Sequence, residues 1–173
     1  MGIIHKPDKV KLITSIFSNR KELFNRVISI LQRDFGPLDF ESEFLSFDKT
    51  DYYTDEMGKG LLRKFYSFKK LIEPNEIVDI KLYTNRIEDR FREEGRRKIN
   101  IDPGYISLGK LVLATTKDQQ HRIYLNKGIY AETTLRYKDG RFMDWEWTYP
   151  DYRTAEYRDI FNKIRDIYRE QIR

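Results

Sequence analysis

The stretch "HRIYLNKGIYAETTLRYKDGRFMDWEW" (residues 121–147) carries most of the information about the fold. Its three β-prone runs are separated by "NKG" and "KDG", which are typical turn sequences. We therefore expect three antiparallel strands in a meander. If the first turn has three residues and Gly128 takes the left-handed conformation, the facing residues are Leu125 and Ile129, Ile123 and Ala131, and Arg122 and Glu132.

Successive side chains of a strand point to opposite faces of the sheet. One face of this meander should pack against the core and carries Ile123, Leu125, Ile129, Ala131 and Leu135. The opposite face carries Arg122, Tyr124, Tyr130, Glu132, Thr134 and Arg136, and the register through the second turn adds Trp145 and Trp147.

The polar face of the meander has two interpretations. As a binding surface it offers arginines for an anion, aromatic rings for stacking, and Glu132 as a proton acceptor or metal ligand. As ordinary sheet, neighbouring Arg, Glu and Tyr form cross-strand pairs that stabilise a solvated face by at most about 1 kcal/mol each. Solvated faces rarely carry two tryptophans, so we expect either a ligand or residues 48–62 to cover this side.

The rest of the chain alternates between strand and helix patterns. Residues 11–17, 38–48, 63–71 and 98–107 have strand character, the last ending at a Pro-Gly turn. Helix patterns begin near 19, with Asn19 and Glu22 as a capping box, and recur over 73–95 and 154–172. Residues 108–116 are ambiguous, and we favour a short helix there.

These elements predict an α+β fold in one domain spanning residues 1–173. We expect a two-layer sandwich in which a mainly antiparallel sheet, ending in the C-terminal three-stranded meander, has its helices on one face.

Composition excludes several classes of protein. The 173 residues contain no cysteine, which rules out disulfides, thiolate zinc sites and a cysteine nucleophile. The net charge is +5, with acids and bases interleaved, a pattern that would also suit a thermophile. With no apolar run long enough to span a membrane, we expect a soluble, cytoplasmic protein without membrane partners.

Common catalytic motifs are also missing from the chain. GxxxxGK[ST], GxGxxG, HExxH and GxSxG do not occur, which argues against a P-loop GTPase, a Rossmann enzyme, a zincin and an α/β-hydrolase.

Other single residues and clusters have both a functional and a structural interpretation. Asp48, Asp51, Asp55 and Glu56 could hold Mg²⁺ or Ca²⁺, or form a solvated acidic loop. His121, three residues after Asp118, could act as a general base or be structural, and His5 lies near the N-terminus. Asp102 could be catalytic at a strand end, or close the Pro-Gly turn. "RFREEGRRK" (90–98) could contact phosphates, or be a solvated helix end.

Four strings, "DYYTDEMG" (51–58), "DPGY" (102–105), "LATTKDQQHRIYLNKGIYAE" (113–132) and "WTYPDYR" (147–153), resemble a family named only as domain of unknown function 4416. The resemblance extends from residue 6 to the last helix. Its members are small bacterial and archaeal proteins without an established activity, sometimes labelled GTP-binding. The resemblance implies that the matching positions are the first to test: Asp51, Tyr52, Tyr53, Glu56, Met57, Gly58, Asp102 to Tyr105, Lys117, Asp118, His121, Arg122, Tyr124, Gly128, Tyr130, Glu132, and Tyr149 to Arg153.

Two hypotheses for function follow. In the first, a nucleotide-like or other phosphorylated small molecule binds in a closed pocket, and the protein could also be an enzyme that acts on it. Its ligand-binding residues would be Lys117, Arg122, Tyr124, Tyr130, Arg136, Trp145, Trp147, Tyr52 and Tyr53, with Asp102, His121 and Glu132 for proton or metal chemistry. In the second, the same face is an open, flat, basic surface that binds RNA or a protein partner without catalysis.

Overall fold

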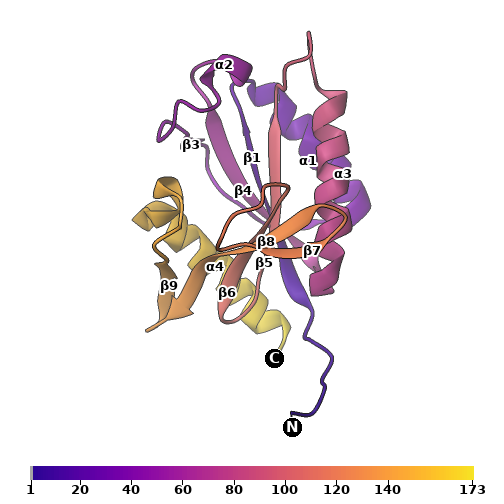
Figure 1. Cartoon of the computed structure of the whole chain (residues 1–173), viewed down its shortest axis with the longest axis vertical. Coiled ribbons are helices and arrows are strands. Elements are labelled where there is room, and N and C mark those ends of the chain that lie inside the picture. Colours follow the sequence, from indigo (N-terminus) through magenta and orange to yellow (C-terminus); the bar gives the residue numbers. More distant parts are fainter. Residues whose placement is uncertain (1) are drawn as a thin grey trace.

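The computed structural model describes residues 2–173 and shows an α+β fold around one nine-stranded antiparallel sheet (Figure 1). The main path of the sheet runs in the order β2-β4-β1-β5-β6-β8-β7, while β3 pairs with β4 and β9 pairs with β8. The strands are β1 (Val10–Ser18), β2 (Leu38–Glu41), β3 (Leu45–Ser46), β4 (Leu62–Ile72), β5 (Asn100–Ile106), β6 (Lys110–Thr115), β7 (Ile123–Asn126), β8 (Ile129–Lys138) and β9 (Arg141–Asp144). The helices are α1 (Lys21–Phe35), α2 (Thr54–Met57), α3 (Ile77–Arg90) and α4 (Ala155–Gln171), with 3-10 turns η1 (Pro74–Glu76) and η2 (Pro150–Arg153). The predicted α+β class and antiparallel sheet are confirmed.

The long helices divide between the two faces of the sheet. On β1, Leu12 and Ile16 belong to the cluster packed by α1 and α3, whereas Ile13 belongs to the cluster packed by α4. Figure 1 shows α1 and α3 together, away from the yellow α4. The expectation that all helices lie on one face is therefore wrong, because the central strands are apolar on both sides and each side needs a cover.

Helix ends follow local chemistry only in part. Thr154 caps α4 by accepting a hydrogen bond from the Tyr157 amide at 3.3 Å. The predicted capping box of α1 is wrong: the N-cap is Arg20, and no side chain caps the helix. Gly36 ends α1 with φ of 90°, as predicted from Gly followed by Pro.

Residues 108–116 do not form the expected helix. Lys110–Thr115 is strand β6, which pairs with β5 on one side and β8 on the other. Pro103 and Gly104 also lie inside β5 instead of ending it. A Cβ on Gly104 would lie 2.3 Å from the carbonyl oxygen of Val112, so glycine is what allows β6 to approach here.

The predicted meander of β7, β8 and β9 is confirmed, but its first turn differs. The turn has two residues, Lys127 and Gly128, both with positive φ. A bulge at Leu125 compensates for the shorter turn, so Ile123 still pairs with Ala131 while the expected pairing of Leu125 with Ile129 is wrong.

The expected single apolar face of the meander does not exist. Ile123 is 70% and Leu125 39% exposed, since β7 is an edge strand and neither large hydrophobic cluster includes one of its residues. A second bulge, at Thr134 in β8, shifts the alternation by one residue. Ile129 consequently packs in the cluster of α3, whereas Leu135 packs in that of α4.

The sheet forks between β5 and β6. β6 pairs with β5 only from Gly104 to Ile106, so the first half of β5 has no strand partner on that side. Side chains from α3 satisfy its backbone there: Glu88 accepts from the Ile101 amide at 2.7 Å, and Lys81 donates to the Ile101 carbonyl at 3.2 Å. The fork leaves an open space between the two halves of the sheet.

Candidate functional site

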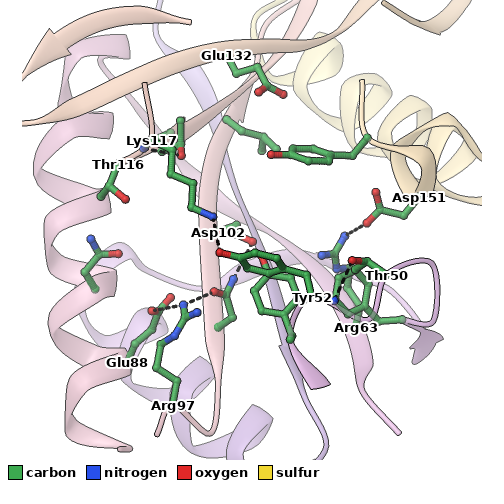
Figure 2. A pocket seen from close by; sticks show the side chains of 18 of the residues that line it. Thr50, Tyr52, Arg63, Glu88, Arg97, Asp102, Thr116, Lys117, Glu132 and Asp151 are labelled. Atoms are coloured by element: carbon green, nitrogen blue, oxygen red, sulfur yellow. Dashed lines mark hydrogen bonds and ion pairs between the residues drawn. The ribbon is translucent and has the colours of Figure 1, made fainter. Parts of the chain in front are cut away.

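A cleft of about 890 Å³ lies at this fork. Its walls come from β4, β5, β6 and β8, from α3, from the loop around α2, and from η2. Figure 2 shows the labelled side chains turned toward a common space, although they come from positions as far apart in the sequence as Thr50 and Asp151. No single sequence window contains this site.

Carboxylates and amides form the β5 side of the cleft. Asp102 accepts from the Asn100 amide at 2.7 Å and pairs with Lys81 at 3.4 Å, while its side chain remains 31% exposed. Burial raises the pKa of Glu88 to about 7, although Lys81 and the Ile101 amide act in the opposite direction. On this side of the cleft, Asp102 is therefore an accessible carboxylate, and Glu88 is a buried carboxylate that binds a proton near neutral pH.

Arg97 joins the loop around α2 to the β5 side of the cleft. Its Nε and Nη2 form a bidentate pair with Glu56 at 2.8 and 2.7 Å, and its Nη1 donates to Asn100 at 2.9 Å. These hydrogen bonds and charges raise the pKa of Arg97 and lower that of Glu56. All three nitrogen atoms of this guanidinium are therefore occupied by protein groups.

Lys117 lies across the cleft from the β5 side, on the turn after β6 (Figure 2). Its Nζ donates to the Tyr52 hydroxyl at 3.3 Å and lies 4.7 Å from the centre of the Tyr52 ring. Within residues 2–173, no carboxylate comes within 4.0 Å of this ammonium group, so two of its donors remain available.

Arg122 holds the turn that carries Lys117. Its Nε donates to Glu132 at 2.8 Å, its Nη1 to the Lys117 carbonyl at 3.0 Å, and its Nη2 to the Tyr149 hydroxyl at 2.9 Å. The Arg122 and Glu132 side chains are each 3% exposed. The prediction that Arg122 and Glu132 face each other is confirmed, but as a buried pair on one wall of the cleft.

The remaining planar groups of the meander stack on one another. Arg136 lies over Trp145 at 4.3 Å, Trp145 stacks on Trp147 at 5.0 Å, and Trp147 stacks on His121 at 5.4 Å. The column fills the edge of β8 between β7 and β9, where the Trp147 indole donates to the Thr133 carbonyl at 3.0 Å. It ends at the contact between His121 and Glu132, at 3.1 Å. The four side chains cover one another, so the tryptophans are covered by neighbouring side chains of the meander and its flanking turns.

The cleft therefore gathers some of the predicted site residues and omits others. Lining it are Asp102, Glu132, Lys117, Arg122, Tyr52, Tyr53 and Glu56. Outside its lining lie His121, Tyr124, Tyr130, Arg136, Trp145 and Trp147. Tyr124 and Tyr130 instead pack against each other, with ring centres 5.3 Å apart.

The acidic loop does not assemble a metal site. Asp48, Asp51 and Asp55 are exposed, and Glu56 is paired with Arg97. Among residues 2–173 there is no group of three or more histidine or carboxylate residues arranged to hold a metal ion. His5 is exposed in the extended segment before β1.

Several residues of the cleft escaped sequence reasoning: Arg63, Lys81, Glu88 and Asn100. Arg97, by contrast, belongs to the stretch 90–98 that was considered for phosphate contacts. Two of the residues that escaped had a detectable signal. Arg63 shares its strand face with Phe65, so alternation placed a charge toward the core. Glu88 follows Thr84 by one helical turn, on the apolar side of α3.

Helices in residues 2–173 are all too short or too polar to cross a membrane.

A family model described as "Domain of unknown function (DUF4416)" matches residues 8–168. Neither the curated proteins nor the solved structures contain a match to the sequence.

Proposed function

The chain belongs to the family described as a domain of unknown function (DUF4416), and on that premise we propose that the cleft at the sheet fork binds a nucleotide-like or other phosphorylated small molecule. The observation that carries the proposal is Lys117, a cation at the wall of a concave site whose ammonium group has no carboxylate partner in the described chain. A phosphate oxygen is the natural partner for such a group.

The dimensions of the cleft suit a ligand of this kind. Small-molecule sites span roughly 300–1,000 Å³ and combine aromatic walls with a few polar groups. Tyr52, Tyr53 and Tyr149 supply aromatic surface here, and Asp102 offers an exposed carboxylate for ligand hydroxyl groups. If the protein is an enzyme, Asp102 and Glu132 are the predicted catalytic groups that line the cleft, whereas His121 would act through Glu132.

The geometry favours this proposal over an RNA-binding sheet face. The cleft is hollow instead of flat, and seven basic lining residues are matched by six acidic ones. Proteins that neutralise many phosphates carry a clear basic excess on their binding face. Tyr124 and Tyr130, the rings expected to stack on bases, lie outside the cleft.

A thermal-shift screen of inorganic phosphate, pyrophosphate, nucleotides and sugar phosphates tests the proposal. A ligand present at 100 times its Kd adds about 2.7 kcal/mol of stability. We expect Lys117→Met to weaken binding of the active compound by about tenfold or more, as expected for one lost charged hydrogen bond. The exposed Lys138→Met, outside the cleft, is the matched control. Stabilisation by RNA but by none of these compounds would refute the proposal.

A further inference from the structure

A second cation of the cleft, Arg63 on β4, is held in an unusual way. Its side chain is 4% exposed, and its guanidinium carbon lies within 6 Å of five aromatic ring centres. The nearest ring is that of Phe47, at 4.1 Å, and the others belong to Phe17, Phe65, Tyr152 and Tyr157. Aromatic faces stabilise a cation electrostatically, but they do not accept its in-plane N–H bonds.

The hydrogen bonds of Arg63 are incomplete. Its Nη1 donates to Asp151 at 2.5 Å, while its buried Nε has no partner within residues 2–173. By contrast, the other two buried or half-buried arginines of the cleft, Arg97 and Arg122, use all three nitrogen atoms. An unpaired buried donor is costly. The Nε of Arg136 is also unpaired, but Arg136 stacks on Trp145 outside the cleft, whereas Arg63 lines the cleft itself.

Asp151 orients the guanidinium without saturating it. Its Oδ2 accepts from Arg63, and its Oδ1 accepts from the Tyr152 amide at 3.0 Å, which ties the carboxylate to η2. The pair therefore fixes the plane of the guanidinium while leaving part of its donor fork unused. A planar donor fork is the group that recognises carboxylate or phosphate in a bidentate manner.

Arg63 and Lys117 come from different walls of the same cleft. In the view of Figure 2 they lie on either side of the Tyr52 ring, with Asp102 between them. We propose that Arg63 binds a second oxyanion of the ligand, so that the cleft takes small molecules carrying two oxyanion groups, one at Lys117 and one at Arg63. The inference rests on the proposed function, because it assigns the other end of the same ligand.

Two probes that differ by one oxyanion test this inference: propanediol bisphosphate and propanediol monophosphate, titrated by calorimetry. We expect wild-type protein to bind the bisphosphate at least about tenfold more tightly, in line with one charged, bidentate contact. Arg63→Lys keeps the charge and loses the planar fork. It should reduce that preference by about tenfold, while the affinity for the monophosphate stays within about twofold.

Controls separate this inference from the proposed function. Arg26→Lys, an exposed arginine over the Phe91 ring and outside the cleft, should keep the full preference. Lys117→Met should weaken both probes. If Lys117→Met acts as expected and Arg63→Lys retains the preference for the bisphosphate, Arg63 is structural and the inference fails alone. If neither probe binds the wild type, both proposals fail.

Two further measurements do not depend on the folding of Arg63→Lys. The ¹H–¹⁵N signal of the Arg63 Nε should shift when wild-type protein is titrated with the bisphosphate, whereas that of Arg97, already paired with Glu56, should not. Asp151→Asn keeps an oxygen that can accept from Arg63 Nη1, and so can still orient the guanidinium, but it removes a negative charge beside the proposed oxyanion. It should therefore tighten bisphosphate binding by about threefold or more. An unmoved Arg63 signal at saturation, or weaker binding in a folded Asp151→Asn variant, would overturn the assignment.

Discussion

Replacing Arg122 by methionine removes the guanidinium group from one wall of the cleft while keeping much of the volume of the side chain. Arg122 donates three hydrogen bonds, to Glu132, to the Lys117 carbonyl and to Tyr149. Methionine fills the space of the aliphatic stem but donates none of them. Glu132, whose side chain is 3% exposed in the wild type, would lose this partner and, within residues 2–173, would keep only the ion-pair contact with His121, which is a cation when its ring is protonated.

The expected cost follows from the burial of the pair. Removing one partner of a buried ion pair costs about 3–5 kcal/mol, because the other charge stays buried and uncompensated. For a chain of this length, 1 kcal/mol corresponds to a shift in Tm of roughly 2–4 °C, so we expect Tm to fall by roughly 10 °C. The destabilisation should be smaller when Glu132 is replaced as well.

Urea unfolding of Arg122→Met, Glu132→Gln and the double variant forms a double-mutant cycle for this pair. The double variant leaves neither charge of this pair buried alone, so we expect it to recover at least about 1–2 kcal/mol relative to Arg122→Met. Arg169→Met is the control, since Arg169 pairs with Asp166 on an exposed surface and should cost about 0.5 kcal/mol. A cost below about 1 kcal/mol for Arg122→Met, or a double variant no more stable than it, would refute the reasoning.

Three further predictions concern the fold around the cleft. Gly104→Ala should destabilise by about 1–3 kcal/mol in urea unfolding, because the new Cβ would lie 2.3 Å from the Val112 carbonyl oxygen, whereas Gly109→Ala meets nothing within 4 Å and should be nearly neutral. Burial raises the pKa of Glu88 from 4.5 to about 7, so the stability that protonated Glu88 contributes is fully present below pH 4.5 and is lost as the pH rises through 7. Glu88→Gln should therefore flatten the plot of unfolding free energy against pH between these values. An unchanged plot would count against the raised pKa. Ile123→Thr should change stability by less than about 0.5 kcal/mol, and a large loss would show that β7 is covered in solution.

Patterns in the sequence were sufficient for much of the fold. Alternation and turn residues predicted β1, β4 and the meander, while the 3.6-residue period predicted α1, α3 and α4. These patterns are local, since each depends on residues a few positions apart. Local chemistry also placed Arg122 beside Glu132, because one hairpin joins them.

Errors arose where a distant partner decided the outcome. The run 110–115 is a strand because β5 and β8 lie on either side of it, and the apolar residues alone fit helix or strand. Bulges at Leu125 and Thr134 changed which side chains share a face, and a single inserted residue leaves little trace in the pattern. The exposure of Ile123 likewise depends on which strand ends the sheet.

The composition of the cleft depends on tertiary structure most of all. The sequence by itself determined that the chain carries Lys117, Arg122, Glu132 and Asp102, and that these could serve a site. Only the fold decided that Arg63 and residues of α3 join them while the tryptophans stack on each other instead. The physical reason is that the cleft forms where β5 and β6 separate, and such a gap depends on contacts between segments far apart in the chain.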